Sequence, residues 1–174
     1  MTGGLIGVIF GLVFIEVNSG QLPHSWQAAT RVVGALAAAV LIAALSRARR
    51  TEPPQTGPAQ RTRPGFARGY WAVVAAEVVA LLAGLAVITV VNGAHKLTVA
   101  WIALIVGIHF FGLGVAWKAT VFHVIGAALT MLGVAGFLIF AADGPAWLVA
   151  LVSGIASGLV LYAAAARWLI SETR

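Results

Sequence analysis

Six long apolar runs, separated by short polar breaks, constrain the fold of this chain more than any other feature. The runs cover roughly residues 3–19, 28–46, 70–91, 97–116, 120–141 and 146–168. A helix needs about 20 mainly apolar residues to cross a bilayer. Hydrophobic residues make up 61% of the 174 residues and charged ones 9%, more apolar surface than one small soluble core can bury. The sequence therefore predicts an all-α, polytopic integral membrane protein with a bundle of six transmembrane helices.

Most of the breaks carry residues that favour turns. The motifs NSGQLP, TEPPQTGP, NGAH and DGP follow the first, second, third and fifth runs. The fourth break, around Lys118, is inferred because residues 97–141 are too many for one span. Every run is expected to be a helix, because irregular backbone that faces lipid leaves its amide groups unsatisfied.

A hydrophilic segment, residues 47–69, divides the chain into a two-helix unit and a four-helix unit. It is rich in Pro, Arg, Thr and Gln and almost lacks apolar residues, a composition typical of mobile linkers. The predicted regions are residues 1–46 with helices 1 and 2, residues 47–69 as a basic cytoplasmic linker, and residues 70–174 with helices 3 to 6 and a short cytoplasmic C-terminal tail.

Basic residues predict the orientation of the bundle. The linker contains six of them: Arg47, Arg49, Arg50, Arg61, Arg63 and Arg68. An even number of spans puts both termini on the linker side, where Lys118, Arg167 and Arg174 bring the total to nine, while the other side keeps Lys96 and Arg31. Because cytoplasmic loops are enriched in Lys and Arg, we expect a multi-pass protein of a bacterial inner membrane with cytoplasmic N- and C-termini.

The same composition limits the partners and cofactors. The lipid bilayer is the expected partner, and the six linker arginines are expected to contact anionic headgroups. Nucleic-acid binding is not predicted, because no aromatic residues interleave with these arginines as a single-strand platform requires. The chain has no cysteine, which excludes disulfides, thiolate metal sites and a catalytic thiol. The first run lacks the basic n-region and cleavage motif of a signal peptide, so we expect a retained span.

Glu77 and His109 are predicted to lie at the same depth. The third and fourth runs are expected to form an antiparallel hairpin that turns at residues 92–94. In such a hairpin, two residues lie at the same depth when their numbers sum to about 186, and 77 and 109 sum to 186. Ionisable groups are costly in lipid and face the protein interior or water. A level carboxyl and imidazole can form an ion pair, or a neutral pair that shares and relays a proton. Alternatively, Glu77 is a protonated structural group and His109 hydrogen-bonds a backbone carbonyl or a threonine.

His123 completes the candidate intramembrane polar cluster of Glu77, His109 and His123. It lies about one helical turn closer to the cytoplasm than His109, on the next antiparallel helix. These residue types suit a metal ion, and two histidines could ligate haem iron. No close-spaced metal motif such as HExxH is present, so haem or a divalent metal is an alternative that the sequence does not firmly imply. His123 could instead be solvated near the membrane interface.

A second polar set lies at the opposite end of the bundle. The first two runs are expected to turn near residues 23–24, which places Glu16 and Arg31 at the same depth. We therefore predict a salt bridge between them that stabilises the first hairpin. Four other polar residues of this end are expected to cap and form turns. They are Asn92, His95, Lys96 and Asp143.

Two stripes of small residues predict close helix packing. Gly3, Gly7 and Gly11 repeat every four residues in the first run, and Gly154 and Gly158 do so in the last. Such spacing lets two backbones approach closely in lipid. Packing within one chain is favoured over a homo-oligomer that uses the same faces.

The sequence favours a channel or transporter subunit that handles protons or cations with Glu77 and His109. Against this hypothesis, no proline interrupts a helix interior, although many transporters have broken helices. The alternatives are a non-catalytic accessory protein acting through the basic loop, and a haem- or metal-binding protein using His109 and His123. Enzyme activity is left open but not favoured, because SGIASG lacks the order of an intramembrane serine protease motif.

Overall fold

The computed structural model describes residues 2–51, 66–91 and 94–172, and these residues form helices and short turns with no strand among them. Apolar composition and the need to pair every backbone amide favour helices throughout. The elements are α1 (Thr2–Ser19), α2 (His24–Thr51), α3 (Phe66–Val90), the 3₁₀ turn η1 (Ala94–Leu97), α4 (Thr98–Trp117), α5 (Thr120–Ala141), α6 (Ala146–Val149), the π-helical segment η2 (Ala150–Ile155) and α7 (Ala156–Glu172).

Five helical segments of the described chain are long and apolar enough to cross a membrane. They are His24–Ala48, Val73–Val90, His95–Trp117, Thr120–Ala141 and Ala146–Ile170. The last combines α6, η2 and α7 into one continuous rod. The first predicted span corresponds to Gly3–Ser19, which is apolar but shorter than the other five.

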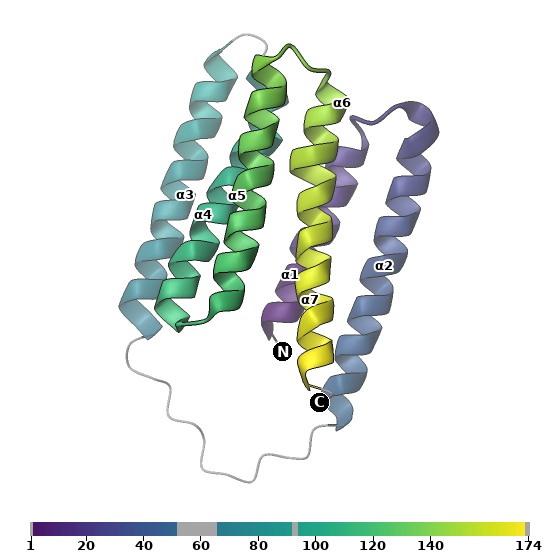
Figure 1. The fold of residues 1–174 in the computed structure, drawn as a ribbon, viewed down its shortest axis with the longest axis vertical. Helices are drawn as coiled ribbons and strands as arrows, with labels where there is room; N and C mark the ends of the chain where they lie inside the picture. Colours follow the sequence, from purple (N-terminus) through teal and green to yellow (C-terminus); the bar gives the residue numbers. More distant parts are fainter. Residues whose placement is uncertain (1, 52–65, 92–93, 173–174) are drawn as a thin grey trace.

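The helices lie roughly parallel and form two neighbouring groups (Figure 1). Helices α3, α4 and α5 stand together, and α1, α2 and α7 form the other group. Helix α1 begins and α7 ends at the same end of the bundle, where α2 also ends and α3 begins. We call this the linker end, and the other the turn end.

Helices α2 and α3 extend further into the predicted linker than their apolar runs suggest. Helix α2 continues to Thr51 and α3 begins at Phe66. Arginines are favourable near a helix C-terminus because their charge interacts with the negative end of the helix dipole. The hydrophilic residues after the apolar run can therefore continue α2. The rest of the predicted linker, residues 52–65, lies outside the described residues.

The core joins helices from both sides of the predicted linker. One cluster joins Val8 and Ile15 of α1 and Leu45 of α2 with Tyr162 and Ala165 of α7. A second cluster joins α1, α4, α5 and α7. Helix α7 therefore packs against α1 and α2, although it is far from them in the sequence. Small residues of α7 let α1 approach closely.

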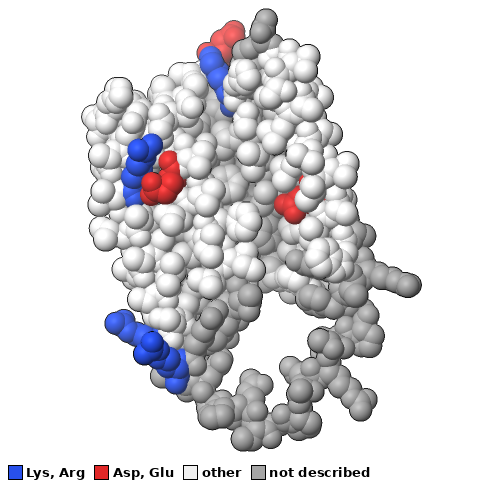
Figure 2. Space-filling model, turned by 180° about the vertical axis from the view of Figure 1, so that it is seen from behind, with Lys and Arg blue, Asp and Glu red and all other residues white. Residues whose placement is uncertain are grey.

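The outward faces of α2 and α3 are strongly apolar. Val33 of α2 is 65% exposed and Leu82 of α3 is 63% exposed. On the face drawn in Figure 2 the described surface is largely uncharged, and its few charged side chains form small separate patches at the linker end, near the middle and at the turn end. Monomeric soluble proteins rarely expose large contiguous apolar patches, and these helices are also apolar enough to cross a membrane.

The weak fourth break is present at the expected place. Helix α4 ends at Trp117, and Lys118 has the left-handed conformation, with φ 51° and ψ 40°. The backbone N–H of Ala119 donates to the carbonyl of Gly114 at 3.1 Å, which closes the helix end as a C-cap does. Helix α5 then starts at Thr120.

Candidate functional site

The Glu77 and His109 side chains meet in the structure. Glu77 lies on α3 and His109 on α4, two antiparallel helices that pack against each other. His109 Nδ1 lies 3.0 Å from Glu77 Oε2, with 13% of the histidine and 19% of the glutamate side chain exposed. A carboxyl and an imidazole are thus in direct contact between two largely apolar helices.

The contact is close without being a well-aligned hydrogen bond. His109 Nδ1 is a buried atom without a hydrogen-bond partner, despite its distance of 3.0 Å from the carboxyl. The ring of His109 also makes an edge contact with Phe110, with centroids 6.0 Å apart. A carboxyl and an imidazole at this distance are groups that can share or exchange a proton.

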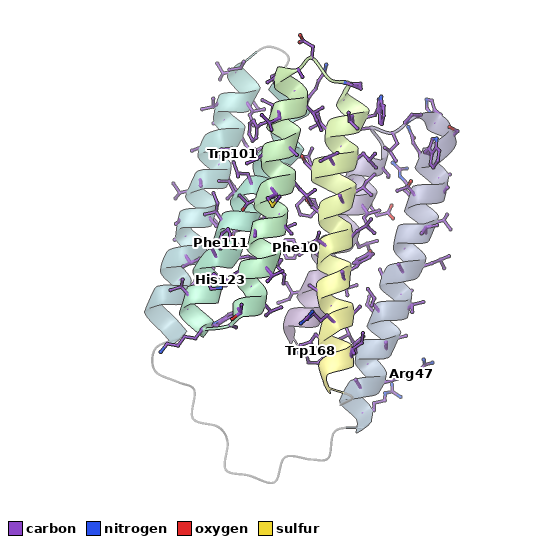
Figure 3. All side chains as sticks on the ribbon, in the orientation of Figure 1. Phe10, Arg47, Trp101, Phe111, His123 and Trp168 are labelled. Atoms are coloured by element: carbon purple, nitrogen blue, oxygen red, sulfur yellow. The ribbon has the colours of Figure 1, made fainter. Side chains whose placement is uncertain are left out.

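His123 does not complete the predicted three-residue cluster as a metal site. Within the described residues, no three histidine, aspartate or glutamate side chains come together in a way that could hold a metal ion. His123 instead packs on α4, its ring 6.0 Å from that of Phe111 and its Nδ1 against Gly114. Figure 3 shows Phe111 and His123 near each other between α4 and α5. Contacts between α4 and α5 determine the direction of the His123 ring. The depth of His123 along its helix does not specify that direction.

The predicted salt bridge between Glu16 and Arg31 is absent from the described structure, where their charged atoms do not come within 4 Å. Arg31 instead donates from Nε to Ser19 Oγ at 2.8 Å. Ser19 Oγ in turn donates to the backbone carbonyl of Glu16 at 2.8 Å. Glu16 Oε1 is buried without a hydrogen-bond partner. Arg31 is therefore linked to the end of α1 by its hydrogen bond to the Ser19 hydroxyl, which is closer to it than the Glu16 carboxylate is.

Comparison with known proteins adds nothing to this geometry. No protein family, curated protein or solved structure matches the chain. The function is therefore argued from the residues and contacts of the chain itself.

The glycine stripes are used inside the chain. A side chain on Gly158 would meet the carbonyl oxygen of Gly11 at 2.6 Å, and one on Gly11 would meet Gly158 and the Tyr162 ring. Gly154 accepts the Asn18 side chain. Gly11, Gly154 and Gly158 are therefore occupied by the α1–α7 contact and are not free for a second copy.

The two outer glycines of the first stripe are less enclosed. Gly7 faces the carbonyl of Leu161 at 3.6 Å, whereas Gly3 has nothing within 4 Å. Of the two stripes, only the end of α1 near Gly3 remains open to a second copy.

The π-helical segment η2 was not predicted from the sequence. Ser153 Oγ donates to the carbonyl of Leu132 on α5 at 2.8 Å, and Asn18 of α1 packs against Gly154. Ser157 is fully buried and its Oγ has no hydrogen-bond partner. Short π segments often mark functional positions, and the two serines beside Gly154 in ALVSGIAS were the available signal.

Proposed function

We propose that this chain is a six-span protein of a bacterial inner membrane whose linker end faces the cytoplasm. Five apolar helices of sufficient length support the proposal, with α1 as a shorter sixth span. Arg47, Arg50, Lys118 and Arg167 belong to the segments nearest the linker end, as a cytoplasmic side requires. Lipid is the cover that suits the exposed apolar faces of α2 and α3.

Within this bundle, Glu77 and His109 form a proton-handling pair of a channel or transporter. The observation that carries this proposal is the 3.0 Å contact between Glu77 Oε2 and His109 Nδ1. Both groups lie well inside candidate spans, Val73–Val90 and His95–Trp117. Ionisable side chains at such positions are costly and typically line ion or proton pathways.

A proton suits the pair better than other cargo. One carboxyl and one imidazole can exchange a proton with little movement, because each group has an acceptor atom facing the other. Neither side chain is fully enclosed by protein, and proton transport through the pair requires that water reach it from each side of the membrane. A metal ion would need further ligands, and the described residues supply no such group of three.

Proton flux in proteoliposomes tests the proposal. The full chain is reconstituted with a pH-sensitive dye inside, and a potassium gradient with valinomycin drives proton entry. We expect flux above that of protein-free liposomes, and we expect Glu77→Gln and His109→Gln each to reduce it to the protein-free level, because each variant removes one proton-exchanging group.

Two matched variants separate a site effect from a general effect of losing polarity. Glu16→Gln removes a carboxyl that contacts no histidine, and His123→Gln removes a histidine that contacts no described acidic side chain. Both should retain flux, with helix content unchanged in all four variants. Equal flux in wild type, Glu77→Gln and His109→Gln would contradict the proposal, as would a wild type that does not exceed empty liposomes.

A further inference from the structure

A pocket of about 490 Å³ opens at the turn end of the bundle, and neither Glu77 nor His109 lines it. It lies between α1, the start of α4 and the α6–η2 segment. Its volume falls in the range of small-molecule and lipid sites, about 300–1,000 Å³.

The lower walls of the pocket are apolar and open to the side. Val13 and Val17 of α1 are four residues apart and share one helix face, and Val99 and Ile102 of α4 stand opposite. Val13 is 52% exposed and Val17 is 71% exposed although both line the pocket. A ligand can therefore enter from the surrounding lipid without passing through the bundle.

The mouth of the pocket is polar and basic. Asn18, Gln21, His95 and Lys96 line it, and Lys96 is exposed and forms no salt bridge with any residue that the structure describes. Two acids lie toward the same end, Glu16 and Asp143, and neither lines the pocket. One end of the pocket thus suits an anion, and the other suits hydrocarbon.

We propose that this pocket binds an anionic phospholipid, with its phosphate at Lys96 and one acyl chain along Val13, Val17 and Val99. The proposal rests on the membrane position proposed above, but not on proton transport. From Asn18 to Val13 the α1 wall descends five residues, about 7.5 Å at 1.5 Å per residue. That depth is about half of one leaflet of a hydrocarbon core about 30 Å thick, so the phosphate would contact the polar mouth and the first part of the acyl chain would contact the apolar walls.

Site-specific quenching tests the proposal, because the chain has no cysteine of its own. The full-length Val17→Cys variant is labelled with a small fluorophore and reconstituted into mixtures of phosphatidylglycerol and phosphatidylcholine, with bromine on the chains of only one lipid. We expect the anionic lipid to quench with about fivefold preference, equivalent to about 1 kcal/mol for one lysine. The label on Val40→Cys, a position of α2 that is 67% exposed and outside the pocket, should show no preference.

Charge variants identify the headgroup contact. Lys96→Gln in the labelled chain should abolish the preference, whereas Lys118→Gln, which removes a lysine at the linker end, should keep it. Equal quenching by both lipids, a preference that survives Lys96→Gln, or relief of quenching by inorganic phosphate would each overturn the proposal. Failure of proton transport would leave these results unchanged, whereas a chain outside the bilayer would show no quenching at either labelled position.

Discussion

Replacing Gly107 with alanine is expected to destabilise the bundle by about 1–3 kcal/mol, the usual cost of overpacking. A Cβ at Gly107 would lie 2.5 Å from the backbone nitrogen of Thr130 and 2.9 Å from the carbonyl oxygen of Gly126. Gly126 is equally enclosed, since its Cβ would lie 2.8 Å from the carbonyl oxygen of Gly107. Two rigid backbones face each other there, so α4 and α5 must separate to admit a methyl group.

The matched control for this prediction is Gly3→Ala. The position lies in α1 and has nothing within 4 Å, so the same change should be neutral or stabilise by up to about 1 kcal/mol through helix propensity. Unfolding of the purified variants in detergent, followed by loss of helical circular dichroism, measures both effects. Equal midpoints for Gly107→Ala and Gly3→Ala would show that α4 and α5 do not pack through Gly107.

Replacing Leu82 with arginine is expected to cost about 3 kcal/mol of membrane insertion and folding. Leu82 lies near the middle of the Val73–Val90 span and is 63% exposed. In lipid, a central arginine costs about 2.5–3.5 kcal/mol, and the favourable leucine term is lost as well. In water, the same exposed substitution would change stability by no more than about 0.5 kcal/mol.

Val90→Arg is the matched control, because it introduces the same charge at the end of the span and not at its centre. Val90 is the last residue of α3 and is 84% exposed, so a long arginine there can extend its charge to the interface. We expect Val90→Arg to accumulate in membranes like wild type and Leu82→Arg to accumulate several-fold less. Equal amounts of both variants in the membrane fraction would contradict a lipid-facing α3.

Some of the local geometry follows from the sequence with little more than helix arithmetic. The third and fourth runs form one hairpin, so residue numbers give relative depth, and Glu77 and His109, placed level by that rule, meet at 3.0 Å. The break near Lys118 likewise follows from length alone, because α4 and α5 together are too long for one span.

The same arithmetic was insufficient for Glu16 and Arg31. Equal depth does not specify the direction of a side chain around its helix, nor does it reveal a nearer partner. Ser19 is that partner, and its hydroxyl receives the Arg31 Nε–H while also donating to a carbonyl of α1. A small polar residue one turn from a charged one carries no distinctive signal in a single sequence.

Long-range packing was the other unpredictable part. Tyr162 of α7 donates to the carbonyl of Gly34 on α2 at 3.0 Å, a contact between opposite ends of the chain. The π-helical segment depends in the same way on Ser153 and Gly154 meeting α5 and α1. Glycine spacing indicated that faces were close-packed, but not which helix would occupy each face.

Cysteine accessibility in intact bacterial cells tests the central claim, that lipid surrounds the bundle and its linker end faces the cytoplasm. Single Lys118→Cys, Asp143→Cys and Leu82→Cys variants are treated with a membrane-impermeant maleimide. We predict labelling of Asp143→Cys in intact cells, labelling of Lys118→Cys only after the membrane is opened, and labelling of Leu82→Cys only after denaturation. Rapid labelling of native Leu82→Cys would show that water covers α3, and labelling of Lys118→Cys in intact cells would show the opposite orientation.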